Sequence, residues 1–303
     1  MVDLSALRGV RLTKGHGTQN DFVLLADPDG ALALDAATVA AVCDRHAGIG
    51  ADGLIRAVRS TAVAGTAGAE EAVARGAEWF MDYRNADGSP AEMCGNGIRV
   101  FVAYLEAAGL LTAADGAPVA IGTRGGVRQV WRTGDLYTVD MGPWGLPGGP
   151  EAVSRGFDVA VQVAGLEGTR AGLRVAMPNP HAVVALADLE ELAAADLGPL
   201  VETDPPAPDG VNVELAVPLG ETTVDGEAAG VVRMRVQERG VGETRSCGTG
   251  TCAVAVALHA WGGPQAPRLW QVLVPGGEVL VRLEEGHALL TGPAELVADV
   301  TLR

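Results

Sequence analysis

The segment Asn85-Ala-Asp-Gly-Ser-Pro-Ala-Glu-Met-Cys94-Gly-Asn-Gly97 is informative because it returns, in altered form, later in the chain. The second copy reads Glu238-Arg-Gly-Val-Gly-Glu-Thr-Arg-Ser-Cys247-Gly-Thr-Gly250. In each copy a polar cluster begins nine residues before a cysteine, and glycine, a polar residue and glycine follow that cysteine. Both copies then enter an apolar run with helical spacing. Two such units, 153 residues apart, predict two halves of similar architecture.

Working outward from these units, alternating apolar residues predict many short strands, and longer periodic runs predict a few helices. The expected strands are Phe22–Ala26, Glu78–Tyr83, Val127–Trp131, Leu136–Met141, Val231–Val236, Leu269–Val274 and Val279–Leu283. The expected helices are Ala36–His46, Gly97–Ala108, Leu186–Leu197 and Gly250–His259. The small-residue segment Thr61–Ala77 is expected to form a hairpin tip or a mobile loop. This mixture indicates an α/β protein of the α+β type rather than a repeating βαβ chain.

The domain organisation follows from length and from one turn-rich segment. A chain of 303 residues fits two domains of roughly 150 residues each. The glycine- and proline-rich segment 142–150 lies near the midpoint and places the junction near Val139. We therefore expect a first half at residues 1–139, completed by a C-terminal strand at 292–303, and a second half at residues 140–291.

The composition excludes several classes of protein. With 48% hydrophobic residues the chain can bury sizeable cores, which excludes disorder as a description of the whole. The formal net charge of −16, with no basic stripe, argues against binding of nucleic acid or of an anionic membrane surface. Glycine and proline interrupt the longest uncharged stretch, so no transmembrane helix is expected. The N-terminus lacks the apolar core of a secretion signal, so we expect a cytoplasmic protein.

The cysteine and lysine content limits which disulfide, metal and cofactor chemistry the chain could support. The four cysteines are too few and too scattered for a disulfide framework, and no Cys/His cluster has the spacing of a zinc site. Cys43 and Cys252 lie on apolar helical faces and are expected to pack in the core. Lys14 is the only lysine, so a single residue could hold pyridoxal phosphate as a Schiff base. We expect neither a metal nor an organic cofactor.

Cys94 and Cys247 each stand just before a predicted helix, where unpaired backbone N–H groups converge. These donors and the helix dipole favour a thiolate and should lower the pKa of each thiol from about 8.5 toward neutrality. The same donors can hold a carboxylate. Inverting a carbon stereocentre removes a proton from one face and returns one to the other, which two opposed thiols can do. The residues thus favour a cofactor-free racemase or epimerase, with a buried helix cap as the alternative role of each cysteine.

Taken together, the motifs resemble the diaminopimelate epimerase family over nearly the whole chain. The segments that carry the resemblance are Lys14–Phe22, Gly48–Asp52, Asn85–Ser89, Met93–Gly97, Asn179–His181, Gly210–Asn212, Glu238–Thr244, Cys247–Gly250 and Thr291–Ala294. The resemblance implies two pseudo-symmetric domains, each a mostly antiparallel sheet wrapped around a central helix, with the active site in the cleft between them. It also implies interconversion of LL- and meso-diaminopimelate, in lysine and peptidoglycan precursor biosynthesis. Family members are often dimers, so a homodimer is the assembly expected by analogy.

The resemblance implies individual roles as well. Cys94 and Cys247 match the two catalytic bases. The other predicted site residues match positions that hold the substrate: Asn20 near the reacting centre, the backbone amides of Gly95, Asn96, Gly248 and Thr249 at the reacting carboxylate, and Asn85, Asn179, Asn212 and Arg239 at the distal amino-acid end, with Glu238 helping to place an ammonium group. His181 is an accessory candidate that would orient the neighbouring asparagine or touch substrate, and a structural loop role is its alternative. Many family members have glutamine where Gly53 stands, so one contact is missing or replaced here.

Three other interpretations stay open at this point. A proline racemase or a PhzF-like isomerase would keep the paired architecture and change the substrate. Proline racemases typically have histidine after Cys-Gly, where this chain has Asn96, and proline needs no distal pair such as Asn212 and Arg239. A non-catalytic amino-acid-binding protein would need neither thiol. Thiol redox chemistry is the third interpretation, and oxidation is expected to link Cys94 to Cys247 if both face one substrate carbon.

Overall fold

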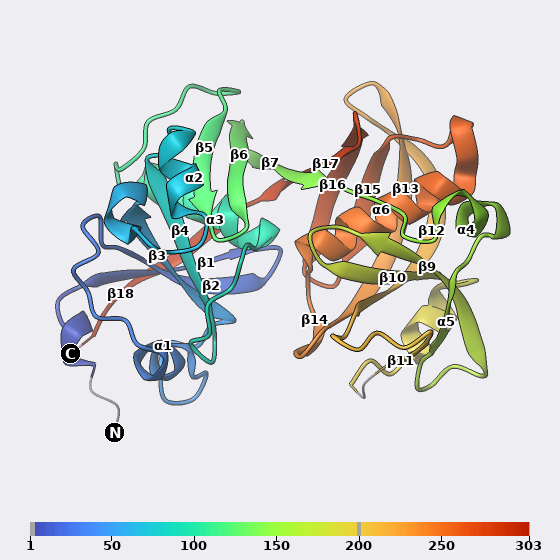
Figure 1. Ribbon diagram of the computed structural model, residues 1–303, viewed down its shortest axis with the longest axis horizontal. Coiled ribbons are helices and arrows are strands. Elements are labelled where there is room, and N and C mark those ends of the chain that lie inside the picture. Colours follow the sequence, from blue (N-terminus) through green and yellow to red (C-terminus); the bar gives the residue numbers. More distant parts are fainter. Residues whose placement is uncertain (1–3, 199–200, 303) are drawn as a thin grey trace. The chain divides into compact units, whose positions relative to one another are not determined.

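The computed structural model describes residues 4–198 and 201–302 and divides into two compact units (Figure 1). Unit 1 comprises the described residues up to Val139 together with those from Gly292 onward. Unit 2 comprises Asp140–Thr291. Among the described residues, no helix is both long and apolar enough to cross a membrane.

Unit 1 is a sheet of eight successively paired strands that surrounds one long helix. In spatial order the strands are β18 (Glu295–Thr301), β1 (Arg11–Gly17), β2 (Asn20–Ala26), β3 (Gly53–Arg59), β4 (Trp79–Asn85), β5 (Val119–Thr123), β6 (Gly126–Thr133) and β7 (Leu136–Pro143). The helices are η1 (Ser5–Leu7), α1 (Ala36–Cys43), η2 (Ser60–Val63), α2 (Ala69–Ala74) and the central α3 (Gly95–Ala107).

Unit 2 repeats this plan. Its strands in spatial order are β8 (Val159–Gln162), β9 (Thr169–Ala176), β10 (Pro180–Ala185), β12 (Asn212–Val224), β13 (Glu227–Glu238), β15 (Leu269–Val274), β16 (Gly277–Glu284) and β17 (His287–Pro293). The short strands β11 (Glu202–Asp204) and β14 (Gly242–Thr244) add to β8 and β13. The helices are α4 (Gly149–Arg155), α5 (Leu189–Ala194), the central α6 (Gly248–Gly262) and η3 (Gly263–Gln265).

The two sheets share one pattern of strand directions. From β18 to β7 the neighbouring pairs are antiparallel except β2–β3 and β4–β5, and from β8 to β17 they are antiparallel except β10–β12 and β13–β15. Each central helix lies in the crossover between the two strands of the second parallel pair, as parallel neighbours require a long connection. The predicted architecture, with a mostly antiparallel sheet around a central helix in each half, is therefore present.

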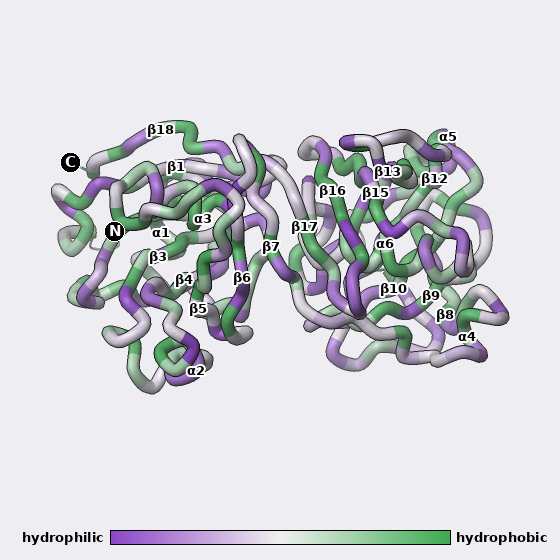
Figure 2. The backbone as a smooth tube through the Cα atoms, turned by 90° about the horizontal axis from the view of Figure 1, so that it is seen from above, coloured by the Kyte–Doolittle hydropathy of each residue, from purple (hydrophilic) through white to green (hydrophobic). Residues whose placement is uncertain are grey.

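Burial of apolar side chains against the surrounding strands stabilises the positions of the central helices α3 and α6. Every residue of α3 from Gly95 to Leu105 is buried, and α3 contacts β1, β2, β3, β4, β6 and β18. Helix α6 is likewise buried along most of its length and contacts β9, β10, β12, β15 and β16. In Figure 2 the backbone of these inner segments is largely hydrophobic, and hydrophilic residues gather at outer turns such as the end of α2. Apolar burial of this kind is the main stabilising contribution to folding.

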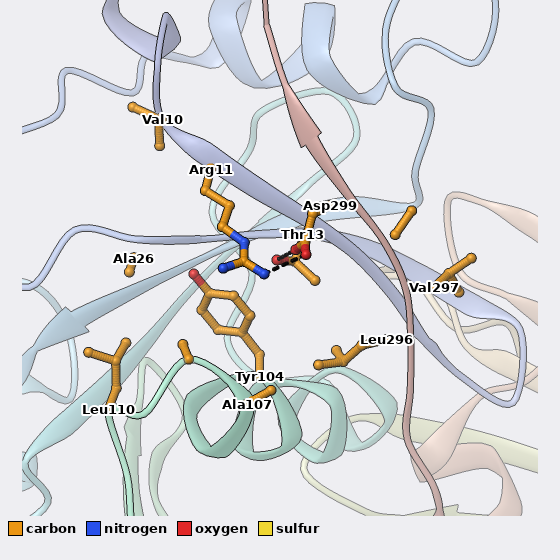
Figure 3. A pocket seen from close by; sticks show the side chains of 12 residues that line it. Val10, Arg11, Thr13, Ala26, Tyr104, Ala107, Leu110, Leu296, Val297 and Asp299 are labelled. Atoms are coloured by element: carbon orange, nitrogen blue, oxygen red, sulfur yellow. Dashed lines mark hydrogen bonds and ion pairs between the residues drawn. The ribbon is translucent and has the colours of Figure 1, made fainter.

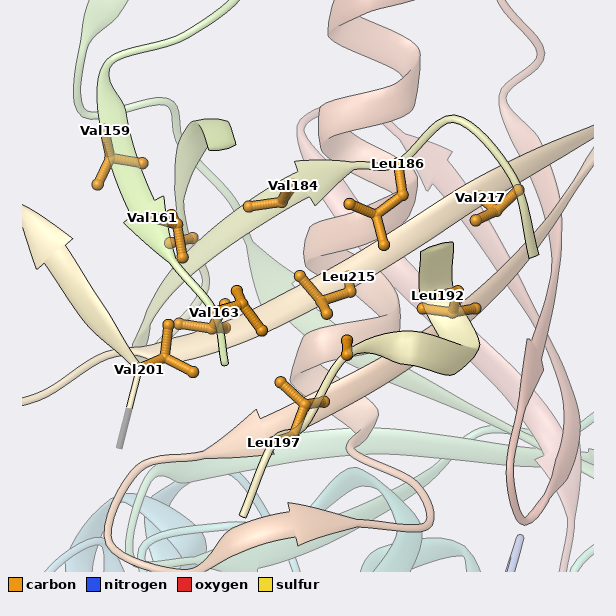
Figure 4. Packing of buried hydrophobic residues seen from close by; sticks show 13 residues of the cluster. Val159, Val161, Val163, Val184, Leu186, Leu192, Leu197, Val201, Leu215 and Val217 are labelled. Carbon is orange, nitrogen blue, oxygen red and sulfur yellow. The ribbon is translucent and has the colours of Figure 1, made fainter. Parts of the chain in front are cut away.

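A second apolar cluster in unit 2 fixes the small outer helix α5. Leu192 and Leu197 pack with Val161, Val184 and Leu215 from three strands (Figure 4). Asp188 caps α5 by accepting a hydrogen bond from the Glu191 N–H.

Strand β18 is held to β1 by side chains as well as by backbone pairing. Thr13 Oγ1 donates to Asp299 Oδ1 at 2.8 Å, and Arg11 forms an ion pair with the same carboxylate (Figure 3). The C-terminal segment therefore forms the edge strand of unit 1.

Two sequence-based expectations are wrong in detail and one is wrong in kind. Two of the predicted helices, α1 and α5, are shorter than expected: α1 stops at Cys43 because the Asp44 carboxylate accepts from the His46 and Ala47 N–H groups in a turn. Helix α5 spans only Leu189–Ala194 of the predicted 186–197, since Leu186 N–H bonds to Ala216 O in the sheet. The segment Thr61–Ala77 is neither hairpin nor irregular loop, because α2 forms there with Ala69 and Ala72 buried.

Candidate active site

Cys94 and Cys247 occupy the same structural position in the two units. Each is the N-cap residue of a central helix, with extended φ and ψ of −137° and 121° at Cys94 and −125° and 115° at Cys247. Each sulfur accepts the N–H three residues on, Gly97 or Gly250, at 3.4 Å. The first-turn N–H groups of both helices lack partners within the helix. Each turn thus presents a thiol beside donors that can hold an anion.

In unit 1 the tip of the β1–β2 hairpin reaches the Cys94 turn. Thr18 and Gln19 have φ of 50° and 62°, as a two-residue type I′ turn requires. This turn places Asn20, whose Oδ1 lies 3.4 Å from both Cys94 Sγ and Asn96 Nδ2. The structure therefore brings three predicted site residues, Asn20, Cys94 and Asn96, into one group.

A buried arginine supports this group from below. Arg99 is fully buried on α3, and its guanidinium donates to Asn96 Oδ1 at 2.6 Å and to Thr18 Oγ1 at 3.4 Å. Arg99 thereby ties the hairpin tip to the start of the helix. The sequence analysis did not single out Arg99, although a cation within the apolar run 98–105 is itself a signal.

Charged residues brace the same end of the hairpin. Asp52 Oδ2 accepts from Asn20 Nδ2 at 2.8 Å, and Arg45 bridges Asp52 and Asp21. Burial opposes ionisation of Asp21, but hydrogen bonds from Arg45 and Lys14 outweigh it and hold its pKa below the ordinary value. The only lysine of the chain is thus engaged in a structural ion pair with Asp21.

Asn85 and Gly53 lie opposite each other on β4 and β3. Asn85 Nδ2 donates to Ser89 Oγ at 3.0 Å, in the turn that follows β4, rather than joining the group at Cys94. A Cβ atom on Gly53 would lie 2.4 Å from the carbonyl oxygen of Arg84. The close approach of β4 therefore leaves no room for a side chain at position 53 in this structure.

In unit 2 the surroundings of Cys247 are acidic. Cys247 is 6% exposed, its sulfur lies 3.4 Å from Thr249 Oγ1, and the nearby Glu238 carboxylate raises the pKa of its thiol. The hydroxyl of Thr244 donates to Glu238 Oε1. Glu238 therefore lies near the Cys247 thiol, and its role in placing an ammonium group of the substrate stays a prediction.

The expectation of a lowered thiol pKa is wrong for Cys247. Burial raises the pKa of this thiol well above its ordinary value, and the carboxylates of Glu238 and Glu214 raise it further. Hydrogen bonds from Thr249 and the Gly250 N–H oppose the rise but do not reverse it. Burial likewise raises the pKa of Glu238. The thiol is therefore the stable form of Cys247 in this structure.

Asn212 and Arg239 form a second group in unit 2. Asn212 Oδ1 accepts the Arg239 N–H at 2.8 Å, and the Arg239 guanidinium donates to Asp209 O. Glu238 and Arg239 line a cavity of about 720 Å³. The guanidinium is exposed, so it is available to bind a carboxylate in two-point fashion.

The accessory candidate His181 is completely buried and bonded on both ring nitrogens. Its Nδ1 lies 2.6 Å from Glu214 Oε1 and its Nε2 lies 2.9 Å from Asn179 Oδ1. His181 thus orients the neighbouring asparagine, one of the two functional roles considered from sequence. The sequence analysis missed Glu214, although a carboxylate between the buried Val213 and Leu215 in an apolar strand is a detectable signal.

A second cavity, of about 640 Å³, lies in unit 1 between α3, β1 and β18 (Figure 3). Tyr104, Leu296 and the Arg11–Asp299 ion pair line it. It contains none of the predicted site residues.

Comparison with known proteins identifies the family. The sequence model of diaminopimelate epimerase matches residues 12–146 and 174–297, which include both cysteine turns. The chain is 48% identical over 297 residues to the diaminopimelate epimerase of Thermobifida fusca, covering 97% of this chain and 98% of that protein. It is 47% identical over 298 residues to the enzyme of Streptomyces coelicolor, covering 96% and 94%. This chain belongs to the diaminopimelate epimerase family.

Solved structures similar to this diaminopimelate epimerase family member show how widely the fold is shared. A phenazine biosynthesis protein of the PhzF family from Bacillus anthracis aligns with a TM-score of 0.63 at 12% identity, over 97% of this chain and 99% of that chain. A hydroxyproline epimerase from Agrobacterium vitis aligns with a TM-score of 0.60 at 15% identity, over 97% and 93%. At such identities the likeness concerns the fold alone, and it confirms the predicted fold class.

Proposed function

We propose that this protein interconverts LL- and meso-diaminopimelate by moving a proton at the α-carbon, without a cofactor. The observation that carries the proposal is the matched N-cap geometry of Cys94 and Cys247 at the starts of α3 and α6. Family membership supplies the substrate, which is the one named for its relatives. The two thiols supply one acid and one base, as inversion of a stereocentre requires.

The environments of the two cysteines suggest which one starts as the acid and which as the base in one direction of the reaction. Cys247 carries the raised pKa and enters as the thiol. Cys94 is partly exposed, and its thiol donates to Asn20 Oδ1 at 3.4 Å, so it gives up this proton before it enters as the thiolate. Its sulfur takes the α-proton while the Cys247 S–H gives its proton to the other face of the carbon. The Cys94 thiol and Cys247 thiolate that result are the starting state for the reverse direction.

The negative charge that develops on the substrate needs fixed donors. The backbone N–H groups of Gly95, Asn96, Gly248 and Thr249 begin the two central helices and are proposed to hold the α-carboxylate. Preorganised donors at helix N-termini stabilise such charge where it forms. The distal carboxylate is proposed to bind the exposed Arg239 guanidinium, with Asn85, Asn179 and Asn212 as further contacts.

Direct assay tests the proposal. Purified, reduced protein is incubated with LL-diaminopimelate, lysine, proline and glutamate in D2O, and the α-carbon of each is analysed by mass spectrometry and chiral chromatography. We expect meso-diaminopimelate with deuterium at the inverted carbon, and no exchange in the other three. Exchange in proline alone would favour the proline racemase interpretation. No exchange in any of the four would favour a non-catalytic binding protein.

The same proposal bears on assembly and compartment. Thiols that must alternate between thiol and thiolate are inactivated by oxidation, so a reducing cytoplasm suits the reaction. The homodimer remains a prediction by analogy, and the mass of the protein in solution, by light scattering, tests it.

A further inference from the structure

Unit 2 holds a buried ionisable pair to which the proposed mechanism gives no role in binding the substrate. The side chains of His181 and Glu214 are both 0% exposed, and they lie 2.6 Å apart. Removing two such groups from water is costly, and a well-packed apolar pair of similar volume is often as stable or more stable. A fold therefore gains nothing obvious from placing them there.

Unit 1 shows what the fold accepts at these two positions. Phe22 pairs with Gly53 in β2–β3, and His181 pairs with Asn212 in the equivalent parallel pair β10–β12. Two residues further along stand Ile55 and Glu214. Phe22 and Ile55 are thus the counterparts of His181 and Glu214.

The starts of the central helices confirm this correspondence. A Cβ atom on Gly97 would lie 3.2 Å from the Ile55 side chain and 3.3 Å from that of Phe22. A Cβ atom on the matching Gly250 would lie 2.8 Å from Glu214 Oε1. The third residue of the central helix therefore packs on apolar side chains in unit 1 and on the ionisable Glu214 side chain in unit 2. The architecture itself does not require the pair.

The hydrogen bonds of His181 have a defined direction. Asn179 Oδ1 is a carbonyl oxygen, which can only accept, so Nε2 at 2.9 Å must carry a proton. Nδ1 faces Glu214, and the two share one further proton: either a carboxylate accepts from imidazolium, or a carboxyl group donates to neutral imidazole. In both cases Nε2 keeps its proton. Glu214 is the group that selects this form of the ring.

The bond from Nε2 also fixes the amide of Asn179. Because its oxygen faces His181, its NH2 group is on the opposite side and can only donate. We propose that Glu214 is a positioning residue that acts through His181 to hold the Asn179 amide so that its NH2 group donates to a carboxylate oxygen of the bound substrate. This inference rests on the proposed function for the identity of that substrate.

Substitutions at position 214 separate positioning from packing. Glu214→Ile gives unit 2 the residue that unit 1 has at this position, and it removes the partner of Nδ1. We expect KM for LL-diaminopimelate to rise about tenfold, because the lost contact is made in the ground state as well as in the transition state. Loss of the Glu214 carboxylate also lowers the pKa of Cys247, so kcat is expected to change too, and by a similar factor in Glu214→Ile and Glu214→Gln. Glu214→Gln can still donate an N–H to Nδ1, so its KM should rise less than half as much.

A control and a second variant keep the result interpretable. Asp158→Asn removes another buried carboxylate of unit 2, one that binds Arg174, and should leave KM within twofold of the wild-type value. The double variant His181→Phe/Glu214→Ile copies the Phe22–Ile55 pair of unit 1. The urea midpoint of unfolding of this double variant should stay within about 0.5 M of the wild-type value, while its KM should show the full rise. The double variant therefore tests the proposal even if Glu214→Ile alone does not fold.

The protonation state of the His181 imidazole can be measured in the absence of substrate. In ¹⁵N NMR of the wild-type protein, the Nε2 of His181 should have the chemical shift of a protonated nitrogen at pH 7, and Glu214→Ile should shift Nδ1 toward the value of an unprotonated nitrogen without a hydrogen bond. An unprotonated wild-type Nε2 would overturn the proposal, as would an unchanged KM in both folded variants. If the wild-type protein epimerises no diaminopimelate, the proposed function fails while the NMR result still decides the form of His181.

Discussion

The two cysteine turns share a backbone and differ in what lies beneath it. Cys94 and Cys247 cap their helices with nearly the same dihedral angles and the same bond to the N–H three residues on. Beneath Cys94 lies the buried cation of Arg99, whereas Cys247 faces the carboxylates of Glu238 and Glu214. The comparison teaches that the repeated fold supplies matched donors, while the buried side chains beneath each turn differ in charge and, in unit 2, raise the pKa of the thiol.

The largest expected effect tests whether both turns are needed. Cys94→Ala and Cys247→Ala should each lower the rate of diaminopimelate epimerisation about a thousandfold or more, because a positioned acid or base contributes on that scale. The assay is chiral chromatography of the product, with circular dichroism to verify folding. A folded variant with full activity would remove that cysteine from the mechanism.

The next prediction concerns the cation beneath Cys94. Arg99→Met keeps much of the volume but removes the hydrogen bonds that the guanidinium donates to Asn96 Oδ1 and Thr18 Oγ1, which a charged donor makes stronger than neutral ones. Losing such bonds costs about 1–3 kcal/mol, so the free energy of unfolding from urea titration should fall by about 2–3 kcal/mol. An unchanged midpoint would show that Arg99 does not hold the hairpin tip to α3.

The different surroundings also predict different thiol reactivity. A raised pKa means less thiolate at a given pH, so Cys247 should react with iodoacetamide at least about tenfold more slowly than Cys94 at pH 8, where thiolate is the reactive form. Its rate should still be rising above pH 9, the ordinary range for a thiol. Peptide mass spectrometry gives both rates.

Glu238→Gln sharpens this test. Removing the Glu238 carboxylate removes one cause of the raised pKa of Cys247, so alkylation of Cys247 should accelerate while that of Cys94 stays the same. Equal rates at both cysteines in the wild-type protein would contradict the contrast between the two turns.

The smallest effect is expected at Cys252, which stands five residues after Cys247 as Arg99 stands five after Cys94. Cys252 is completely buried on α6. Cys252→Ala should lower the free energy of unfolding by about 1 kcal/mol, as for loss of a small buried side chain, and leave epimerase activity within twofold. A large loss of activity would show that this thiol is more than part of the core.

Much of the fold was predictable because strands such as β15 and helices such as α3 carry clear apolar periodicity. Strand β12 was not predicted, since its outer half, from Pro218 to Thr223, is polar and exposed and is held by pairing with β13. Helix α2 was missed because small residues give little periodic signal. Pairing and burial between distant segments decide such elements, and a local pattern does not contain them.

The site was predictable where residue type and order are specific. Cys94, Asn20 and Asn96 were predicted as site residues and lie together. Arg99 and Glu214 were missed because their importance comes from burial beneath the helix starts, which depends on the whole sheet. The raised pKa of Cys247 was missed for the same reason, since desolvation by distant strands outweighs the local helix dipole.

Isotope transfer in the first turnovers tests the central claim, that separate thiols remove and return the proton. LL-diaminopimelate is mixed with the protein in D2O, and recovered substrate and meso product are analysed before one tenth has reacted. The account predicts deuterium at the inverted carbon of nearly every product molecule and protium in the recovered substrate. Product that keeps its original proton would contradict it, because one group would then have carried that proton from face to face.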